Sequence, residues 1–308
     1  MQRLRIAIEA AQGRHEPIDH VLLSGPPGLG KTTLAQIVAH EMHAGSLVHT
    51  SGPALEKVAD LVGITTRLED GDVLFVDEIH RLARQVEEYL YPAMEDLKID
   101  FVLDKGAEAS AVRFDIKPFT LIGATTRKAL ISNPLRDRFG IQIELDFYSV
   151  DELAQIIART AKQIGFEITT DACQELGRRS RGTPRIANRL LRRVRDYVQV
   201  RNPKGKADKK QVAEALEIEG VDALGLDELD RRYLRTLMLD YGGGPAGVAA
   251  LAASMQQEED TLADVIEPHL LYIGLLVRTP TGRRPTPAAY THLQIQGERT
   301  NGKQHQTR

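Results

Sequence analysis

The sequence of 308 residues contains a single cysteine, no tryptophan and only 5% aromatic residues. The lone Cys173 excludes an intramolecular disulfide and any zinc site built from several cysteines. No run approaches the ~20 consecutive apolar residues of a membrane-spanning helix. The first residues also lack the apolar core and the small-residue cleavage site of a secretory signal. We therefore expect a cytoplasmic protein that does not enter a membrane.

A large excess of charge of one sign is also lacking, because the chain has 40 Lys and Arg and 43 Asp and Glu. This balance, with 42% hydrophobic residues, indicates a globular protein and excludes a chain that is disordered throughout. Basic residues gather only between Arg178 and Lys210, where 13 Lys and Arg accompany two acids, Asp196 and Asp208. Such a band is typical of an anionic partner or of a solvated helix face, and by itself it favours the helix face.

The first half of the chain alternates short apolar stretches with helical patterns. The expected strands lie at residues 20–25, 46–52, 72–78 and 119–126, and the alternation ends after residues 142–147. Strands that alternate with helices predict an open, mainly parallel α/β sheet. Residues 99–116 alternate at both ends around a polar centre that contains glycine, which predicts a hairpin projecting from this sheet.

Beyond residue 147 the pattern becomes helical. Ser149, three residues before Glu152, forms a capping-box signature, and residues 202–210 resemble a boundary. Three further helices and a small hairpin, with Gly282, Arg283 and Arg284 at its tip, outline a winged helix. We predict domains at 1–147, 148–220 and 221–295, followed by a disordered tail at 296–308.

A phosphate-binding loop follows the first expected strand. Its eight residues fit the G-x4-G-K-[ST] pattern, with a strand before and a helix after it: Gly25, Pro26, Pro27, Gly28, Leu29, Gly30, Lys31 and Thr32. Glycines allow backbone N–H groups to converge on phosphate oxygens, and the helix start adds its positive dipole end. Lys31 can reach the β- and γ-phosphates, the Thr32 hydroxyl can ligate Mg²⁺, and Thr33 completes the predicted nucleotide contacts.

Asp77 and Glu78 follow a buried strand, at the sheet edge where ligands of such sheets bind. Asp77 would hold the magnesium, and Glu78 would orient and deprotonate the attacking water. With the phosphate loop, this pair predicts hydrolysis of a nucleoside triphosphate. Thr125 or Thr126, at the end of another strand, could sense the γ-phosphate or position the water. The alternative for both threonines is an ordinary strand end.

Three arginines are candidates for contacts to the nucleotide. Arg136 and Arg138 lie in a loop after the threonine strand, and an arginine that reached a neighbour's γ-phosphate would make hydrolysis depend on oligomerisation. Arg185 opens a helix after Pro184 and could reach the nucleotide from the helical domain. A surface ion pair is the alternative for each of them.

Taken in order, the motifs GPPGLGKTTLA, TSGPALEK, VLFVDEIHRL, YPAMED, FTLIGATTR, PLRDRFGI and RGTPRIANRLLRRVRD resemble the RuvB family of AAA+ ATPases. The resemblance covers residues 1–293. It implies an α/β P-loop AAA+ ATPase domain with a parallel sheet, an all-α lid domain and a C-terminal winged-helix domain. It also implies a DNA helicase that hydrolyses ATP with Mg²⁺ and drives Holliday-junction branch migration in recombination and repair. The implied partners are duplex DNA and Holliday junctions, RuvA, RuvC in the resolving complex, and further copies in a homo-hexamer.

The resemblance also assigns individual roles. Those at the nucleotide are Walker A for Lys31 and Thr32, Walker B for Asp77 and Glu78, sensor 1 for Thr126 or Thr125, the arginine finger for Arg138, and sensor 2 for Arg185. The hairpin at 99–116 would bind RuvA through Val112 and Phe114, unless these two residues pack on the sheet. Arg283 and Arg284 match the family's basic wing. We expect no acid beside this arginine pair, which suits contact with DNA phosphates without reading sequence.

The chain begins inside the first expected helix, whereas family members begin further upstream with a segment that helps to enclose the adenine. We therefore expect nucleotide affinity and hexamer packing to be affected. Other functions remain open at this point: another AAA+ enzyme such as a clamp-loader subunit or an unfoldase, a nucleotide-gated transcription regulator, or a P-loop kinase. Duplex-DNA binding by residues 221–295 alone would argue against an unfoldase. Binding that is selective for one DNA sequence would favour a transcription regulator. A kinase leaves the winged helix unexplained.

Overall fold

The computed structural model describes residues 2–102, 111–202 and 205–295. The chain forms two compact units, of which the first contains Met1–Gly25 and Leu29–Asp146, and the second contains Pro26–Gly28 and Phe147–Arg308. The centre of the hairpin expected at 99–116 and the tail expected at 296–308 lie outside the described residues.

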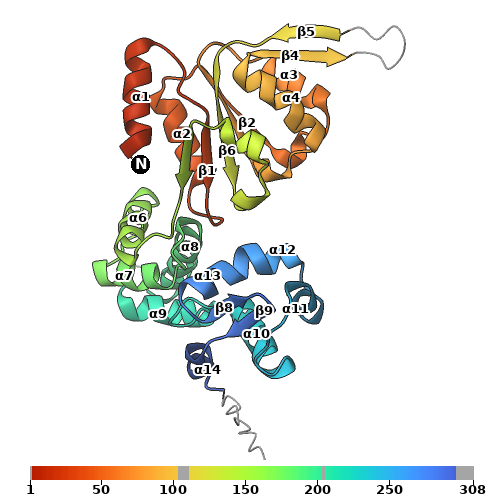
Figure 1. Ribbon diagram of the computed structural model, residues 1–308. Coiled ribbons are helices and arrows are strands. Elements are labelled where there is room, and N and C mark those ends of the chain that lie inside the picture. Colours follow the sequence, from red (N-terminus) through yellow and green to blue (C-terminus); the bar gives the residue numbers. More distant parts are fainter. Residues whose placement is uncertain (1, 103–110, 203–204, 296–308) are drawn as a thin grey trace, which may run out of the picture. The chain divides into compact units, whose positions relative to one another are not determined.

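A five-stranded parallel sheet forms the centre of the first unit (Figure 1). The strand order is β2-β3-β6-β1-β7. The strands are β1 (Val21–Ser24), β2 (Leu47–Ser51), β3 (Asp72–Asp77), β6 (Phe119–Thr125) and β7 (Ile141–Glu144). The predicted parallel α/β sheet is confirmed, and the four predicted strands form it together with β7.

Helices cover both faces of this sheet because successive strand residues point to opposite sides. Leu22 and Leu121 belong to one apolar core, whereas their neighbours Leu23 and Ile122 belong to the other. The helices are α1 (Gln2–Arg14), α2 (Lys31–Glu41), α3 (Val58–Thr65), α4 (Arg84–Glu95) and α5 (Asn133–Asp137). Single 3₁₀ turns follow three strand ends: η1 (Gly52–Ala54), η2 (Ile79–Arg81) and η3 (Lys128–Leu130).

The hairpin expected at 99–116 is present as two antiparallel strands, β4 (Lys98–Val102) and β5 (Ala111–Asp115). Ile99 pairs with Phe114, and Phe101 pairs with Val112. Its alternating sequence fits this pairing, since Phe114 and Val112 share one side of β5.

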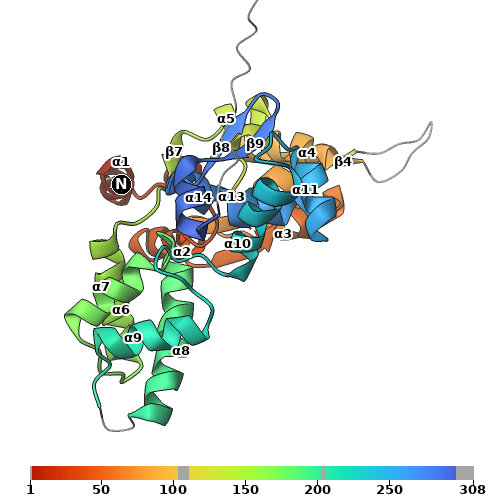
Figure 2. The same cartoon turned by 90° about the horizontal axis from the view of Figure 1, so that it is seen from below.

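Four helices follow in the second unit and lie together in Figures 1 and 2: α6 (Val150–Gln163), α7 (Thr170–Arg178), α8 (Pro184–Arg201) and α9 (Lys209–Ile218). The predicted capping box at α6 is confirmed, because Ser149 accepts from the Glu152 backbone N–H and Glu152 accepts from that of Ser149. These helices enclose one apolar core, which ends at Val221.

A separate core begins at Leu226 and belongs to the C-terminal part of the second unit. Its elements are α10 (Glu228–Arg235), the π-turn η4 (Thr236–Asp240), α11 (Val248–Met255), α12 (Glu259–Thr261), the π-turn η5 (Leu262–Ile266), α13 (Glu267–Tyr272), β8 (Leu276–Thr279), β9 (Gly282–Pro285) and α14 (Pro287–Leu293). Helices packed beside a β8–β9 hairpin form the predicted winged helix.

One detail of the winged-helix prediction was wrong. Thr279 pairs with Gly282, so the hairpin turn is Pro280 and Thr281, and Arg283 and Arg284 lie in β9 rather than at the tip. Gly282 adopts φ 141°, which a glycine tolerates and which lets the strand begin directly after the turn. Across the described ranges, no helix is long and apolar enough to cross a membrane.

Candidate nucleotide-binding and hydrolysis site

The loop between β1 and α2 owes its shape to its glycines. Gly25, Gly28 and Gly30 have φ of 141°, 83° and 91°, a region that other residues adopt only with strain. A Cβ on Gly25 would lie 2.4 Å from the Leu145 carbonyl oxygen, so only glycine fits at this position. The loop can therefore turn its backbone N–H groups inward, as phosphate binding requires.

Lys31 begins α2 and is buried, with 8% of its surface exposed. Its Nζ donates to the Gly25 carbonyl at 2.7 Å, which holds the ammonium group over the first residue of the loop. The first turn of α2 presents its backbone N–H groups and the positive end of the helix dipole at the same place. Thr32 is half-buried in this turn, and Thr33 is exposed.

The acidic pair lies at the carboxyl end of β3, two strands from the phosphate loop. β6 separates β3 from β1, and the Gly25 N–H donates to the Thr125 carbonyl at 3.2 Å, so the loop is tied to the end of β6. Asp77 is half-buried, and its Oδ1 accepts from the Glu78 N–H at 2.9 Å. Glu78 has φ 49° and pairs with Arg81 at 3.1 Å. The parallel sheet thus brings the phosphate loop, the acidic pair and the threonines to one edge.

Thr125 and Thr126 differ in their surroundings. Thr125 is 1% exposed, and its hydroxyl lies 3.0 Å from His80 Nδ1 and accepts from the Arg127 N–H at 2.9 Å. Thr126 follows β6 directly and is half-buried. His80 is a residue that the sequence analysis missed. Its signal was its position three residues after Asp77, in the turn that follows the acidic strand.

The donors at this edge suit a magnesium ion that keeps phosphate and water ligands. Over the described parts of the chain, no group of three or more His, Cys, Asp and Glu residues could hold a metal ion. Thr32 and Asp77 instead offer one hydroxyl and one carboxylate. Mg²⁺ in nucleotide sites is typically held by one or two protein oxygens together with phosphates and waters.

Arg136 and Arg138 flank the C-terminal end of α5. Arg138 donates to the Pro134 carbonyl at 2.8 Å, pairs with Glu95 at 2.9 Å, and its guanidinium lies 4.4 Å from the centre of the Tyr91 ring. Arg136 donates to the Asn133 side chain at 2.7 Å. Arg138 therefore has the more fixed position of the two, with 22% of its side chain exposed.

Arg185 lies in the second unit, in the first turn of α8 after Pro184. Its backbone N–H lies 3.3 Å from the Gly28 carbonyl, which accepts from it, and its side chain is exposed. A cavity of about 200 Å³ is lined here by Gly28, Thr183 and Arg185 together with Arg181, Asp227 and His269. Residues Pro26–Gly28 of the phosphate loop belong to the second unit, and Arg185 lies beside them in that unit.

The two apolar hairpin residues have mixed surroundings. Phe114 is partly buried and packs against the core that contains Ile99. Val112 is half-buried on the same side of β5, and the intervening Arg113 is exposed and pairs with Asp100 at 2.7 Å. Packing on the first unit therefore accounts for part of the Phe114 surface, and the rest of this side remains accessible.

The expectation that no acid lies beside the arginines of the wing was wrong, because Glu267 contacts Arg283. Glu267, which is fully buried at the start of α13, accepts from Arg283 at 2.9 Å and from Arg278 at 2.8 Å. The Tyr233 hydroxyl donates to the same carboxylate at 2.9 Å. Arg284 is exposed. Sequence analysis missed Glu267 because it lies 16 residues before Arg283 and meets it only through the fold.

Ion pairs account for a large part of the basic band between 178 and 210. Arg178 at the end of α7 and the following Arg179 pair with the buried Glu175, and Arg193 and Arg195 pair with Asp196. Arg181 is buried and pairs with acids of the winged helix. The band therefore agrees with the structural alternative more than with a continuous anion-binding surface.

Comparison with known proteins gives the same family along the whole described chain. Residues 1–145 match the model of the Holliday junction DNA helicase RuvB P-loop domain. Residues 148–222 match the RuvB AAA lid domain, and residues 223–294 match the RuvB C-terminal winged helix domain.

Individual relatives are similar over nearly the same length. The Holliday junction branch migration complex subunit RuvB of Desulfosudis oleivorans is 58% identical over 296 residues, which are 96% of this chain and 86% of the relative. The protein of the same name from Kosmotoga olearia is 57% identical over 294 residues, 96% of this chain and 85% of the relative. The solved Thermotoga maritima RuvB Holliday junction branch migration motor is 50% identical with a TM-score of 0.88, and the alignment covers 96% of this chain and 93% of that one.

Proposed function

Because the chain belongs to the RuvB family, we propose that it is an ATP-driven motor that moves duplex DNA and drives Holliday-junction branch migration in recombination and DNA repair. The observation that carries this proposal is the combination of two parts in one chain. A phosphate loop shares a sheet edge with an acidic pair, and a winged helix follows on the same unit as Arg185. The proposed boundaries 1–147, 148–220 and 221–295 are supported by the apolar cores, which fall into three groups along the chain, although Val221 still packs in the lid core.

ATP binds at the loop from Gly25 to Thr32, with Thr33 beside it. Lys31 neutralises the β- and γ-phosphates, a role that its position against the Gly25 carbonyl supports. Thr32 and Asp77 hold Mg²⁺, which neutralises phosphate charge when it is bound. Arg185, at the start of α8, contacts the nucleotide from the second unit.

Glu78 orients and deprotonates the attacking water. Its carboxylate is exposed at the end of β3, and its ion-pair partner Arg81 is exposed as well, so the carboxylate can reach a water at the sheet edge. Thr126 senses the γ-phosphate, since the Thr125 hydroxyl is already bonded to His80 and to the Arg127 N–H. Thr125 and His80 then act together to fix the end of β6.

Arg138 acts in trans on the nucleotide of a neighbouring subunit in a homo-hexameric ring. An arginine that stabilises transition-state charge must arrive in a fixed orientation, and contacts to Glu95 and Tyr91 supply one. Hydrolysis would then require assembly. The existing partners of Arg138 are half-exposed or aromatic, so exchange for a phosphate is feasible.

The winged helix contacts the DNA backbone. Arg284 is the exposed arginine of β9, and Arg283 lies beside it with one side of its guanidinium on Glu267. Phosphate contacts of this kind give binding without sequence selectivity, which a translocating motor requires. RuvA binds the β4–β5 hairpin through Val112 and Phe114, RuvC joins the resolving complex, and the motor works in the cytoplasm where its DNA substrate lies.

Steady-state ATP hydrolysis with and without long duplex DNA tests this function. We expect DNA to stimulate hydrolysis by the purified chain, and we expect E78Q to bind ATP without turnover, because the amide cannot accept the proton from water. The proposal would be contradicted by an ATP hydrolysis rate that is the same with and without DNA. It would also be contradicted if E78Q hydrolysed ATP as fast as the unaltered chain.

A further inference from the structure

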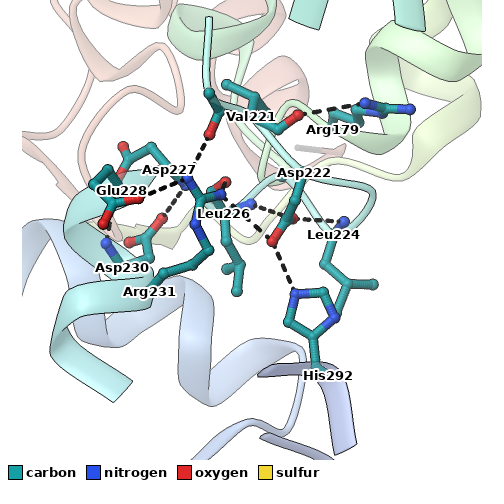
Figure 3. A network of polar contacts seen from close by, with 12 residues as sticks. Arg179, Val221, Asp222, Leu224, Leu226, Asp227, Glu228, Asp230, Arg231 and His292 are labelled. Carbon is teal, nitrogen blue, oxygen red and sulfur yellow. Dashed lines mark hydrogen bonds and ion pairs between the residues drawn. The ribbon is translucent and has the colours of Figure 1, made fainter. Parts of the chain in front are cut away.

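The segment from Gly220 to Asp227 joins the two cores of the second unit, and we call it the linker. The lid core ends at Val221 and the winged-helix core begins at Leu226. Linkers between domains are commonly exposed and flexible, with their polar groups bonded to water. This linker is instead bonded to protein groups on both sides (Figure 3).

Asp222 organises the linker from within. Its Oδ1 accepts from the backbone N–H groups of Leu224 and Leu226, both at 2.9 Å. Its Oδ2 lies 2.8 Å from His292 on α14 and 3.7 Å from Arg231 on α10 (Figure 3). One carboxylate therefore fixes the turn of the linker and ties it to two helices of the winged helix.

Side chains from both sides also bind the linker carbonyls. On the winged-helix side, Arg231 donates to Gly220 at 2.9 Å and to Leu226 at 2.8 Å. His269 Nε2 lies 3.1 Å from the Leu224 carbonyl. Burial lowers the pKa of His269 to about 4, so the ring is neutral at pH 7 and donates this hydrogen bond from Nε2.

The lid side contributes two arginines. Arg179 lies 3.3 Å from the Val221 carbonyl, and Arg181 donates to the Gly225 carbonyl at 2.8 Å. Carbonyls at 220, 221, 224, 225 and 226 are thus bound by side chains from the lid or the winged helix. Such a network favours one arrangement, because a displacement would leave several partly buried polar groups unpaired at once.

Arg181 also spans the boundary directly. It is 6% exposed, has φ 51°, and pairs with Asp227 and Asp230, which lie at the N-cap and in the first turn of α10. It lies four residues before Arg185, and both line the cavity beside Gly28. One short loop therefore connects a nucleotide-facing arginine to the first helix of the winged helix.

The two carboxyl groups that contact Arg181 have pKa values shifted in opposite directions. Burial above all raises the pKa of Asp230 to about 7. Burial also opposes ionisation of Asp227, but the Arg181 guanidinium and backbone N–H groups outweigh it and lower the pKa of Asp227. Asp227 is therefore the permanently charged partner, and Asp230 fills the interior of the contact.

We propose that Arg181 is a positioning residue which, with the bonded linker, makes the lid and the winged helix move as one rigid body. A nucleotide-driven movement at Arg185 then moves the DNA-binding winged helix by the same amount. The proposal rests on the motor function given above. Its physical basis is that a coupled movement needs an element with one defined arrangement, and a linker of free carbonyls would absorb the movement instead.

R181K is the informative variant. Lysine keeps the positive charge next to Asp227, so the fold is retained, but its single ammonium cannot serve two carboxylates and the Gly225 carbonyl in the fork geometry of arginine. D222N weakens the contacts of the linker with the winged helix. The asparagine oxygen can still accept from the linker N–H groups, but the NH₂ group that replaces Oδ2 cannot accept a hydrogen bond from His292 or pair with Arg231. R193K is the matched control, since Arg193 is an exposed arginine of α8 that pairs with Asp196 at 3.5 Å.

The experiment measures three quantities on the full chain: DNA-stimulated ATP hydrolysis, duplex-DNA binding, and base pairs of junction migration per ATP hydrolysed. For R181K and D222N we expect hydrolysis and binding near those of the unaltered chain, and migration per ATP lower by on the order of tenfold. R193K should change none of them. Hydrogen exchange at the Leu224 and Leu226 amides should be faster in both linker variants.

The possible outcomes separate the two proposals. Full migration per ATP in R181K and D222N would overturn the coupling role. A parallel loss of hydrolysis, binding and migration in both variants would also overturn it, because Arg181 would then be structural only. If the unaltered chain hydrolyses ATP with DNA but moves no junction, the motor function itself fails, whatever the variants do.

Discussion

Replacing Glu267 by glutamine is expected to destabilise the winged helix strongly. Glu267 is fully buried, and its carboxylate accepts from Tyr233, Arg278 and Arg283 at 2.8–2.9 Å. In E267Q one oxygen becomes an amide that points a donor at a guanidinium, and two arginines lose their counter-charge. Breaking a buried ion pair by removing one partner costs roughly 3–5 kcal/mol.

The exposure of the two arginines lowers this figure. Half of the Arg278 side chain and a fifth of the Arg283 side chain are exposed, so both can recover hydrogen bonds to water. We therefore expect E267Q to lose about 2–4 kcal/mol of unfolding free energy. For a unit of this size that corresponds to a melting temperature lower by roughly 5–15 °C.

Differential scanning calorimetry of the full chain, supported by urea unfolding, measures this effect. Y233F is a graded partner to E267Q, because it removes only the hydroxyl that donates to Glu267 and should cost about 1 kcal/mol. E258Q, at an exposed glutamate of the same domain, is the matched control and should change little. An unfolding free energy of E267Q within about 0.5 kcal/mol of that of E258Q would contradict the prediction, because the Glu267 carboxylate would then make no net contribution to stability.

Three further outcomes are expected. K31A should weaken ATP binding, measured by titration calorimetry, because it removes the ammonium that neutralises the phosphates; unchanged affinity would contradict the role of Lys31. R138A should bind ATP nearly as well as the unaltered chain and lose hydrolysis of the assembled ring, and full turnover would exclude a shared site. Burial raises the pKa of Asp230 to about 7 from its ordinary 3.8, so the native state keeps a proton that the unfolded chain loses, and the stability that Asp230 contributes falls as pH rises from about 4 to 7. His269 titrates in the opposite sense over the same range, so the test is the difference in unfolding free energy from D230N, which should vary by a few kcal/mol over this range and stay constant if the pKa of Asp230 is ordinary.

The parts of the fold that follow local rules were predictable from the sequence. The apolar strands at 72–77 and 119–125 and the capping box of Ser149 and Glu152 depend on neighbouring residues, and they are present where expected. The phosphate loop was predictable for the same reason, because its glycines determine the backbone over eight consecutive residues.

Contacts between distant residues were not predictable from the sequence. Arg181 looked like one member of a basic band, yet its partners Asp227 and Asp230 are more than 40 residues further along the chain. Arg283 was expected beside no acid, because Glu267 meets it only after α13 packs on the hairpin. The sequence also does not distinguish Thr125 from Thr126, whereas the contact of Thr125 with His80 distinguishes their surroundings.

Movement of a Holliday junction is the most direct test of the proposed motor function. A synthetic four-way junction with long homologous arms, RuvA, Mg²⁺ and the purified chain are incubated with ATP, and the separated duplex products are measured over time. We expect ATP-dependent migration that stops when E78Q replaces the unaltered chain. Rapid ATP hydrolysis on DNA without any movement of the junction would contradict it.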